Sequence, residues 1–325
     1  MKNQSITEAM LQFIEESPTA FHAAANVEAL LLENGFEKLE NLAEGALVPG
    51  GSYYTMQNGS AVLAVKIPEN PAKGFRIAAS HSDSPCFKIK EVPEMKVENT
   101  YVKLNVEKYG GMILSPWLDR PLSVAGRVFV AGKDGKPEVK LVNLKKDLLI
   151  IPNVAIHFNR EINNGFAYNP QTDMAPLMGL DQELSIKKLC AEAAGVAEEE
   201  ILGSDLYVYN RDKGRIMGAD DSLIGSPRLD DLQCAYATLR GFLASKPEEF
   251  ISVYALFDNE EVGSGTKQGA DSTFLEEFLE IVLENIYPDK NRLWKRSFYQ
   301  NSFLLSADNG HAVHPNHPEK TDSTN

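Results

Sequence analysis

Two adjacent glutamates, Glu260 and Glu261, follow an apolar and β-branched stretch that runs from Ile251 to Phe257. The pattern of that stretch predicts a buried strand, and the acidic and glycine-rich residues after it predict a turn. Neighbouring side chains at a strand end point in different directions. One glutamate can therefore bind a metal ion while the other faces a substrate as a general base. For the pair taken alone, a solvated turn is the alternative interpretation.

Other predicted strand ends carry side chains of the same kind. His81 and Asp83 follow one predicted strand, and Asp308 follows another. Asp230 stands at or near the start of a predicted helix. In open α/β sheets, binding sites form beyond the carboxyl ends of strands, so we expect these residues to meet. Asp83 comes two residues after His81, where its carboxylate can orient the imidazole through the second ring nitrogen.

The chemistry of these side chains indicates a metal site. One histidine with several carboxylates suits zinc, with manganese and cobalt as alternatives, better than a metal that prefers thiolates. Taken singly, His81 fits a satisfied polar residue, Asp230 a helix cap and Asp308 a turn residue. Their shared placement favours the metal site.

The segments around these residues also resemble a known family. In chain order they read His81-Ser-Asp-Ser-Pro-Cys, Ser226-Pro-Arg-Leu-Asp, Phe257-Asp-Asn-Glu-Glu-Val-Gly-Ser and Ser306-Ala-Asp, followed by His311-Ala-Val-His-Pro-Asn. This set closely resembles the M18 family of metalloaminopeptidases, the aspartyl aminopeptidase group, over essentially the whole chain.

The resemblance implies a site with two zinc ions. His81, Asp230 and Asp308 would hold one ion, Asp230 would bridge to a second ion bound by Glu261, and Glu260 would be the general base. We therefore predict Glu260 and Asp83 as the catalytic residues and the other four as metal ligands. The implied reaction removes acidic or neutral N-terminal residues from peptides.

The elements that must position these residues fall into three parts. Near residues 85 and 219 the pattern changes from α/β to short alternating strands and back, with a hairpin signal at Asp134-Gly135. Within this stretch, 159–181 and 211–221 read as loops. We predict an α/β fold in which residues 1–84 and 219–325 form a mixed-sheet zinc-peptidase domain. Residues 85–218 would form an inserted β-rich domain, which the resemblance implies is a dimerisation domain.

His157, inside this insert, has the local pattern of an ordinary strand-end histidine. In resembling proteins, the matching histidine reaches a neighbouring subunit's site and steadies the reacting carbonyl oxygen. The resemblance therefore implies that His157 binds substrate and that the protein is a homo-oligomer built from dimers, typically a dodecamer.

The sequence departs from the family pattern after Asp308. Asn309-Gly310 stands where the family usually has Met-Ala, and family members continue well beyond the position of Asn325. That further segment carries the second zinc's histidine and residues of the substrate pocket. We expect a complete first metal position, an incomplete second one, and apolar sheet surface left uncovered. The alternatives are a truncated, catalytically impaired subunit that retains an assembly function, and a related M42-type aminopeptidase.

Composition sets the remaining limits. The chain has 325 residues, 43% of them hydrophobic, and a net charge of −14, which argues against nucleic-acid and anionic-membrane partners. Its three separated cysteines form neither a disulfide framework nor a zinc finger, which favours a cytoplasmic protein. We find no apolar signal-peptide segment and no apolar run of membrane-spanning length.

Overall fold

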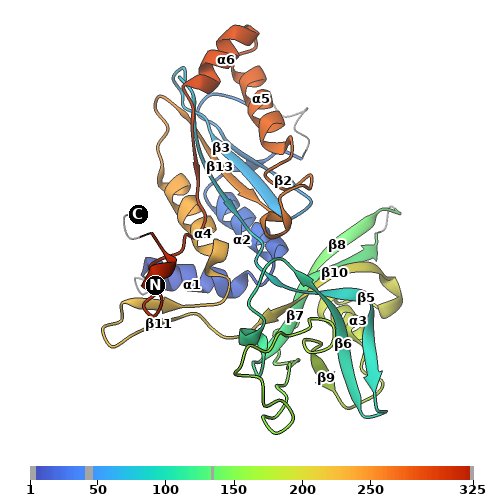
Figure 1. The fold of residues 1–325 in the computed structure, drawn as a ribbon. Helices are drawn as coiled ribbons and strands as arrows, with labels where there is room; N and C mark the ends of the chain where they lie inside the picture. The colour runs from blue at the N-terminus through green and yellow to red at the C-terminus, as the bar shows by residue number, and fades with distance from the viewer. Residues whose placement is uncertain (1–4, 41–46, 133–134, 323–325) are drawn as a thin grey trace.

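The computed structural model of the protein describes residues 5–40, 47–132 and 135–322. Two six-stranded sheets dominate it, and Figure 1 shows them one above the other. Sheet A is mixed, with the order β1-β2-β3-β13-β4-β14. Its strand β13 lies between β3, to which it is antiparallel, and β4, to which it is parallel. The strands of sheet A are β1 Glu37–Lys38, β2 Ser52–Gln57, β3 Ala61–Lys66, β4 Phe75–His81, β13 Ile251–Phe257 and β14 Phe303–Ser306.

Helices cover both faces of sheet A because its central strands are apolar on both sides. In β13, Val253 and Phe257 pack in the cluster with α5 and α6, whereas Tyr254 and Leu256 pack in the cluster with α1, α2 and α4. This alternation on a strand that is buried on both faces is typical of the central strands of a three-layer α/β/α arrangement. The helices are α1 Ile6–Glu16, α2 Ala20–Glu33, α4 Leu229–Ala244, α5 Phe274–Ile286 and α6 Arg292–Gln300.

Sheet B is antiparallel and forms a module of its own, which we call the sheet-B module (residues 86–210). Its order is β8-β7-β10-β5-β6-β9, and α3 packs in the same apolar cluster. A third, two-stranded sheet pairs β11 with β12. These elements are β5 Cys86–Val97, β6 Tyr101–Tyr109, β7 Leu122–Ala131, β8 Pro137–Asn143, β9 Leu177–Gly179, α3 Ile186–Ala194, β10 Ile201–Asn210, β11 Arg215–Met217 and β12 Leu223–Gly225.

The predicted fold class is confirmed, since a mixed sheet with helices on both faces is interrupted in sequence by an antiparallel, β-rich module. Some elements differ from the prediction. β9 and β11 lie in the segments 159–181 and 211–221, which the sequence pattern assigned to loops. β7 and β8 pair antiparallel around the predicted hairpin turn, in which Gly135 has a φ of +72°. Asp134, the other residue of that turn, lies outside the described residues.

Arg127 is one of the side chains that join the sheet-B module to sheet A. Arg127 of β7 is 8% exposed, and its Nη1 donates to the backbone oxygen of Asn58 in the turn before β3, at 2.7 Å. Its Nε donates to Asp205 of β10 at 2.9 Å, and its guanidinium lies 4.1 Å from the ring centre of Phe21 in α2. The two sheets therefore share a buried polar contact as well as their chain connections.

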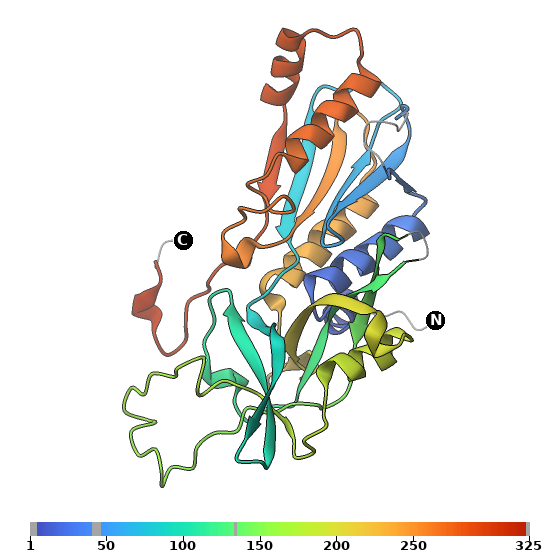
Figure 2. The same cartoon turned by 90° about the vertical axis from the view of Figure 1, so that its right-hand side faces the viewer.

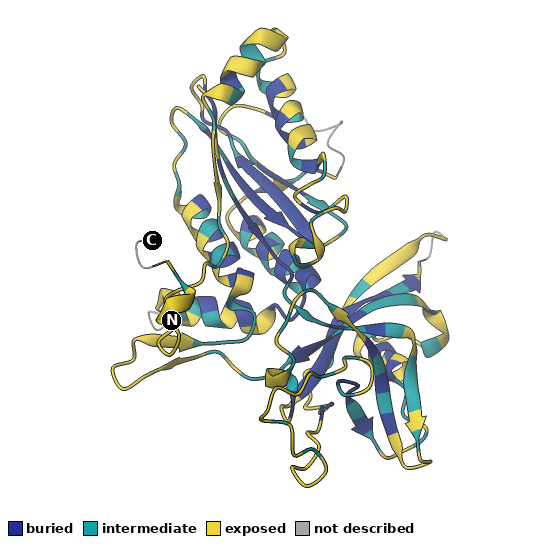
Figure 3. Ribbon diagram, in the orientation of Figure 1, coloured by how far each residue is buried: buried dark blue, intermediate teal, exposed yellow. Residues whose placement is uncertain are grey.

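Among the exposed apolar side chains of the described residues, those of β14 and of one long loop bear on function. In β14, at the edge of sheet A, Phe303, Leu304 and Leu305 are 60%, 45% and 52% exposed, in agreement with the expected uncovered sheet surface. A long loop, residues 152–173, extends away from the strands of sheet B, as Figure 2 shows, and its Phe158 is 87% exposed. Figure 3 shows the contrast with the buried central strands of sheet A.

Candidate metal centre

Three neighbouring strands of sheet A bring their carboxyl ends to one edge. β4 pairs in parallel with β13 on one side and with β14 on the other. His81 is the last residue of β4, and Asp308 follows β14 by two positions. The strand-end rule applied to the sequence therefore places these residues together, as the predicted site required.

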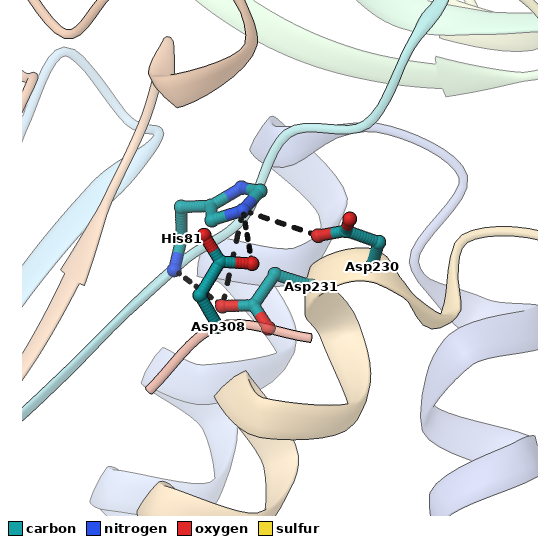
Figure 4. Close-up of side chains that lie close together, drawn as sticks. All are labelled: His81, Asp230, Asp231 and Asp308. Carbon is teal, nitrogen blue, oxygen red and sulfur yellow. Dashed lines mark hydrogen bonds and ion pairs between the residues drawn. The ribbon is translucent and has the colours of Figure 1, made fainter. Parts of the chain in front are cut away.

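His81 is the centre of the resulting cluster (Figure 4). The ring is buried, and its Nε2 lies 3.4 Å from Asp230 Oδ1. The same nitrogen lies 3.9 Å from Asp308 Oδ1 and 3.9 Å from Asp231 Oδ2. One ligand atom from each of these four residues lies within 4.8 Å of the others.

This donor set fits a zinc ion. Four ligand atoms at about 2.0–2.2 Å from a tetrahedral zinc lie about 3.4 Å from one another, so the spacing around His81 Nε2 needs little adjustment. Asp231 Oδ1 is also buried without a hydrogen-bond partner among the described residues. A buried carboxylate oxygen without a donor is costly unless a cation is near it.

Asp231 is the member of the cluster that sequence reasoning missed. It is completely buried at the start of α4, and its Oδ2 accepts the backbone N–H of His81 at 3.1 Å. The available signal was its adjacency to Asp230, which repeats the doubled acid of Glu260 and Glu261. Because Asp230 and Asp231 both depart from helical φ and ψ, both carboxylates can face His81.

Asp83 lies on the other side of the His81 ring. Its Oδ1 is 3.2 Å from His81 Nδ1, and the carboxylate is 4% exposed. The backbone N–H groups of Glu260 and Glu261 donate to Oδ1 and Oδ2, each at 3.1 Å. Asp83 thus connects the histidine at the end of β4 with the turn after β13.

That turn separates the two glutamates. Asn259 and Gly263, with φ of 63° and 99°, bound the 3₁₀ helix η3, Glu260–Val262. Glu260 is half exposed, and its Oε2 lies 3.9 Å from His81 Nε2. Glu261 is not part of the cluster of four residues that includes His81. Together with burial, the charges of Asp83 and Asp230 nevertheless contribute to raising the pKa of Glu261.

The charges at the centre are unbalanced toward the negative. Burial raises the pKa of Asp231 to about 6 and, with the nearby charge of Asp83, that of Glu261 to about 7. Burial alone would lower the pKa of His81, but Asp83, Asp231 and Glu260 raise it to about 9. A bound cation would stabilise the ionised forms of the carboxylates whose pKa is raised, so these shifts favour a cation site.

The structure does not bring the remaining histidines to this cluster. His157 is exposed in the loop 152–173 and is not among the residues that gather around His81. His314 and His317 lie beside each other, with ring centres 5.3 Å apart, and His317 Nδ1 is 3.2 Å from Glu319 Oε1. Neither supplies an atom to the cluster.

A cavity of about 680 Å³ lies between the α1–α2 corner, the start of α4 and the sheet-B module. Its lining includes Asp83 and Asp230 but not His81, Glu260 or Asp308, so it reaches the centre from the side of the module.

In the part of the chain that the structure describes, we find no helix with the length and apolar character that crossing a bilayer demands.

Comparison with known proteins identifies relatives over nearly the whole chain. The family model "Aminopeptidase I zinc metalloprotease (M18)" matches residues 13–325. A "Probable M18 family aminopeptidase 2" from Clostridium acetobutylicum is 44% identical over 331 residues, which cover 99% of this chain and 76% of that protein. The chain therefore spans about three-quarters of that relative.

Solved structures agree with this match. The structure described as the Ape4 and Nbr1 complex contains a chain that is 32% identical, with a TM-score of 0.92, covering 98% of this chain and 66% of that one. The mApe1 dodecamer of S. cerevisiae is 26% identical, with a TM-score of 0.85, covering 97% of this chain and 74% of that one.

Proposed function

Because this chain belongs to the M18 family of zinc aminopeptidases, we propose that it removes single residues from the N-termini of peptides at the centre around His81. The family assignment replaces the M42-type alternative. The observation that carries the proposal is the cluster of one imidazole nitrogen and three carboxylates at the carboxyl ends of parallel strands.

The surroundings of the carboxylates support the following ligand assignment. His81, Asp230 and Asp308 would hold one zinc ion, and Asp231, the fourth residue of the cluster, accepts the backbone N–H of His81 through its Oδ2. Asp230 and Glu261 contribute to a second position, which lacks a histidine among the described residues. Asp83 fixes the ring of His81 through Nδ1. Zinc bound there would lower the pKa of a water molecule and polarise the scissile carbonyl.

Glu260 is the general base in this proposal. Its half-exposed carboxylate reaches toward His81 Nε2 from the turn after β13, so a water molecule at the centre lies within its range. It removes the proton from the attacking water and delivers it to the leaving amine. A free α-amino group fits an acidic centre of this kind, which restricts attack to the first peptide bond of a substrate.

Residues 85–218 form the dimerisation domain in this proposal, and residues 1–84 and 219–325 form the zinc-peptidase domain. The exposed loop 152–173 supports an assembly, because Val154, Ile156 and Phe158 are 59%, 50% and 87% exposed and His157 lies among them. The relative from S. cerevisiae is a dodecamer. We extend that behaviour to this chain, with His157 reaching the centre of a neighbouring subunit.

A paired measurement tests the proposed function. Elemental analysis after dialysis should find one tightly held zinc ion per chain and a second that dialysis removes. With excess zinc, the protein should release N-terminal aspartate, glutamate or alanine from peptide amides, and a chelator should stop this release reversibly. N-terminally acetylated copies of the same peptides are the control. A zinc-loaded, oligomeric protein that hydrolyses none of them would support the alternative of a subunit with an assembly role only.

A further inference from the structure

The sheet-B module contacts the candidate centre directly through the end of β6. The hydroxyl of Tyr109, the last residue of β6, donates to Asp83 Oδ2 at 2.7 Å. Asn259 Nδ2 in turn donates to the Tyr109 hydroxyl at 2.9 Å. Tyr109 is thus inserted between the residue that holds His81 and the turn that carries Glu260 and Glu261.

The surroundings of Tyr109 keep it in this position as a donor. Its ring packs edge-on against Tyr207 of β10, with ring centres 5.7 Å apart. Burial and the neighbouring Asp83 raise the pKa of Tyr109, so its hydroxyl stays protonated. Asn259 is also fixed, because its Oδ1 accepts hydrogen bonds from Thr266 and Gln268, each at 2.8 Å.

The next residue makes a second, independent contact. Gly110 has a φ of +75°, and a Cβ added to it would lie 3.0 Å from Glu261 Cβ and 3.3 Å from Glu261 Oε2. Only glycine adopts this backbone conformation without strain, and only glycine leaves Glu261 its present place. The adjacent Gly111 has open space at the corresponding point.

We propose that Tyr109 and Gly110 are positioning residues of the metal centre: Tyr109 fixes the carboxylate of Asp83, and Gly110 provides the space in which Glu261 meets the metal. In this arrangement the sheet-B module acts on the centre of its own chain, apart from any part it plays between subunits. The inference rests on the proposed function for the roles of Asp83 and Glu261.

The alternative is that these contacts only tie the module to sheet A. Metal binding separates the two possibilities, because a structural tie changes the melting temperature and leaves the metal's surroundings unchanged. Removal of residues that orient metal ligands typically costs 10- to 100-fold in metal affinity or activity. Cobalt(II) is a suitable probe in addition to zinc, since its visible spectrum reports on the geometry of its ligands.

The experiment introduces Tyr109→Phe and Gly110→Ala separately into the 325-residue chain. The matched controls are Tyr101→Phe, an exposed tyrosine at the other end of β6, and Gly111→Ala. Zinc affinity is measured by competition with a chelating dye, together with the cobalt spectrum and the melting temperature without metal. Where the parent hydrolyses a peptide amide, kcat and KM are compared as well.

We expect Tyr109→Phe to weaken zinc binding about 10-fold or more and to alter the cobalt spectrum, with kcat lowered and KM little changed. Gly110→Ala should affect the more weakly held ion most. Both controls should match the parent. Zinc affinity and a cobalt spectrum that match the parent in Tyr109→Phe would overturn the inference, whatever happens to the melting temperature.

The outcome is separable from that of the proposed function. A parent that binds zinc but hydrolyses nothing contradicts the proposed activity, while a weakened Tyr109→Phe still supports the inference. A parent that binds neither zinc nor cobalt contradicts both. If Gly110→Ala does not fold, Tyr109→Phe alone decides, because it removes one oxygen atom and keeps the ring contact with Tyr207.

Discussion

Glu260 and Glu261 are adjacent in sequence but have different surroundings. Glu260 is half exposed and faces His81 Nε2, whereas Glu261 lies against Gly110 and has a pKa raised to about 7 by burial and by Asp83. A buried carboxylate with a raised pKa gains most from a neighbouring cation, and an exposed one is free to exchange protons. This difference supports the proposed division into a base, Glu260, and a ligand, Glu261.

We predict that Glu260→Gln lowers kcat by about 10²–10⁴ and leaves the zinc content unchanged, since it removes only the proton acceptor. Glu261→Gln should lose the weakly held ion. Zinc analysis and turnover of a peptide amide check both variants, with the exposed Glu276→Gln of α5 as control. Substantial turnover by Glu260→Gln, or loss of its tightly held zinc, would reverse the assignment.

A second prediction concerns His22 of α2, at the junction of the two sheets. Burial lowers the pKa of His22 from 6.5 to about 4, and the charge of Lys145 acts in the same direction. The unfolded chain therefore binds a proton near pH 6.5 that the folded chain binds only near pH 4. Stability is unaffected by His22 above pH 6.5 and falls as the pH drops toward 4, by up to about 3 kcal/mol.

The measurement is urea unfolding between pH 4 and pH 8. His22→Gln should reduce the loss of unfolding free energy at the acidic end, whereas His317→Gln, at an exposed position, should not. Equal pH dependence in the parent and in His22→Gln would show that other groups cause the acid loss.

The residues that the sequence made predictable are those at strand ends. His81 and Asp308 follow apolar strands, so a general rule for parallel sheets places them together. Asp231 and Tyr109 follow no such rule. Tyr109 reaches the centre only because β6 ends against the turn after β13, and no local pattern records a contact between segments so distant in sequence. Sequence reasoning therefore located the centre and missed part of its support.

At the scale of elements, the same distinction holds. β3 and β13 are foreseeable because their apolar runs are buried on both faces, and β4 because it alternates at its start and is buried over its last three residues. β9 and β11 have three residues each, and β11 is exposed along its length, so partner strands rather than composition define them. The helix α6 was not predicted, although Trp294 and Phe298 recur at helical spacing and pack together.

The prediction at this scale concerns the stability contributed by Arg127, which connects β7 to the turn before β3. Arg127→Met should destabilise the protein by about 1–3 kcal/mol, since it leaves the partly buried Asp205 carboxylate and the Asn58 carbonyl without this donor. Lys88 Nζ, 3.4 Å from Asp205 Oδ1, offsets part of this loss. Urea unfolding measures the change.

Arg120→Met is the matched control, because Arg120 pairs with Asp212 at the surface, where an ion pair contributes at most about 1 kcal/mol. An Arg127→Met variant as stable as Arg120→Met would mean that the buried contact contributes little to the joining of the two sheets.

At the scale of the whole molecule, the prediction is that the exposed loop 152–173 takes part in subunit assembly. If it docks on another subunit, sedimentation of the protein at micromolar concentration should give an assembly of dimers or larger. His157→Ala and Glu260→Gln subunits should each be inactive alone and should regain part of the activity when mixed, because a mixed pair contains one complete centre.

The control for this mixing is each variant mixed with itself under the same exchange conditions. A mixed assembly verified by mass that recovers no activity would leave His157 with a structural role only. A folded monomer at the same concentration would contradict the proposed dimerisation domain.

The position of β13 also determines when the molecule can fold. β3 and β4 are consecutive in sequence, but β13 lies between them and begins about 170 residues after His81. At about 5–20 residues per second, a ribosome takes roughly 10–30 s to make that stretch. During this time the facing edges of β3 and β4 lack β13, whereas every strand of sheet B is made before β13. The part of the chain that is made first is therefore completed last, and chaperones that bind unpaired strands have their longest access to it.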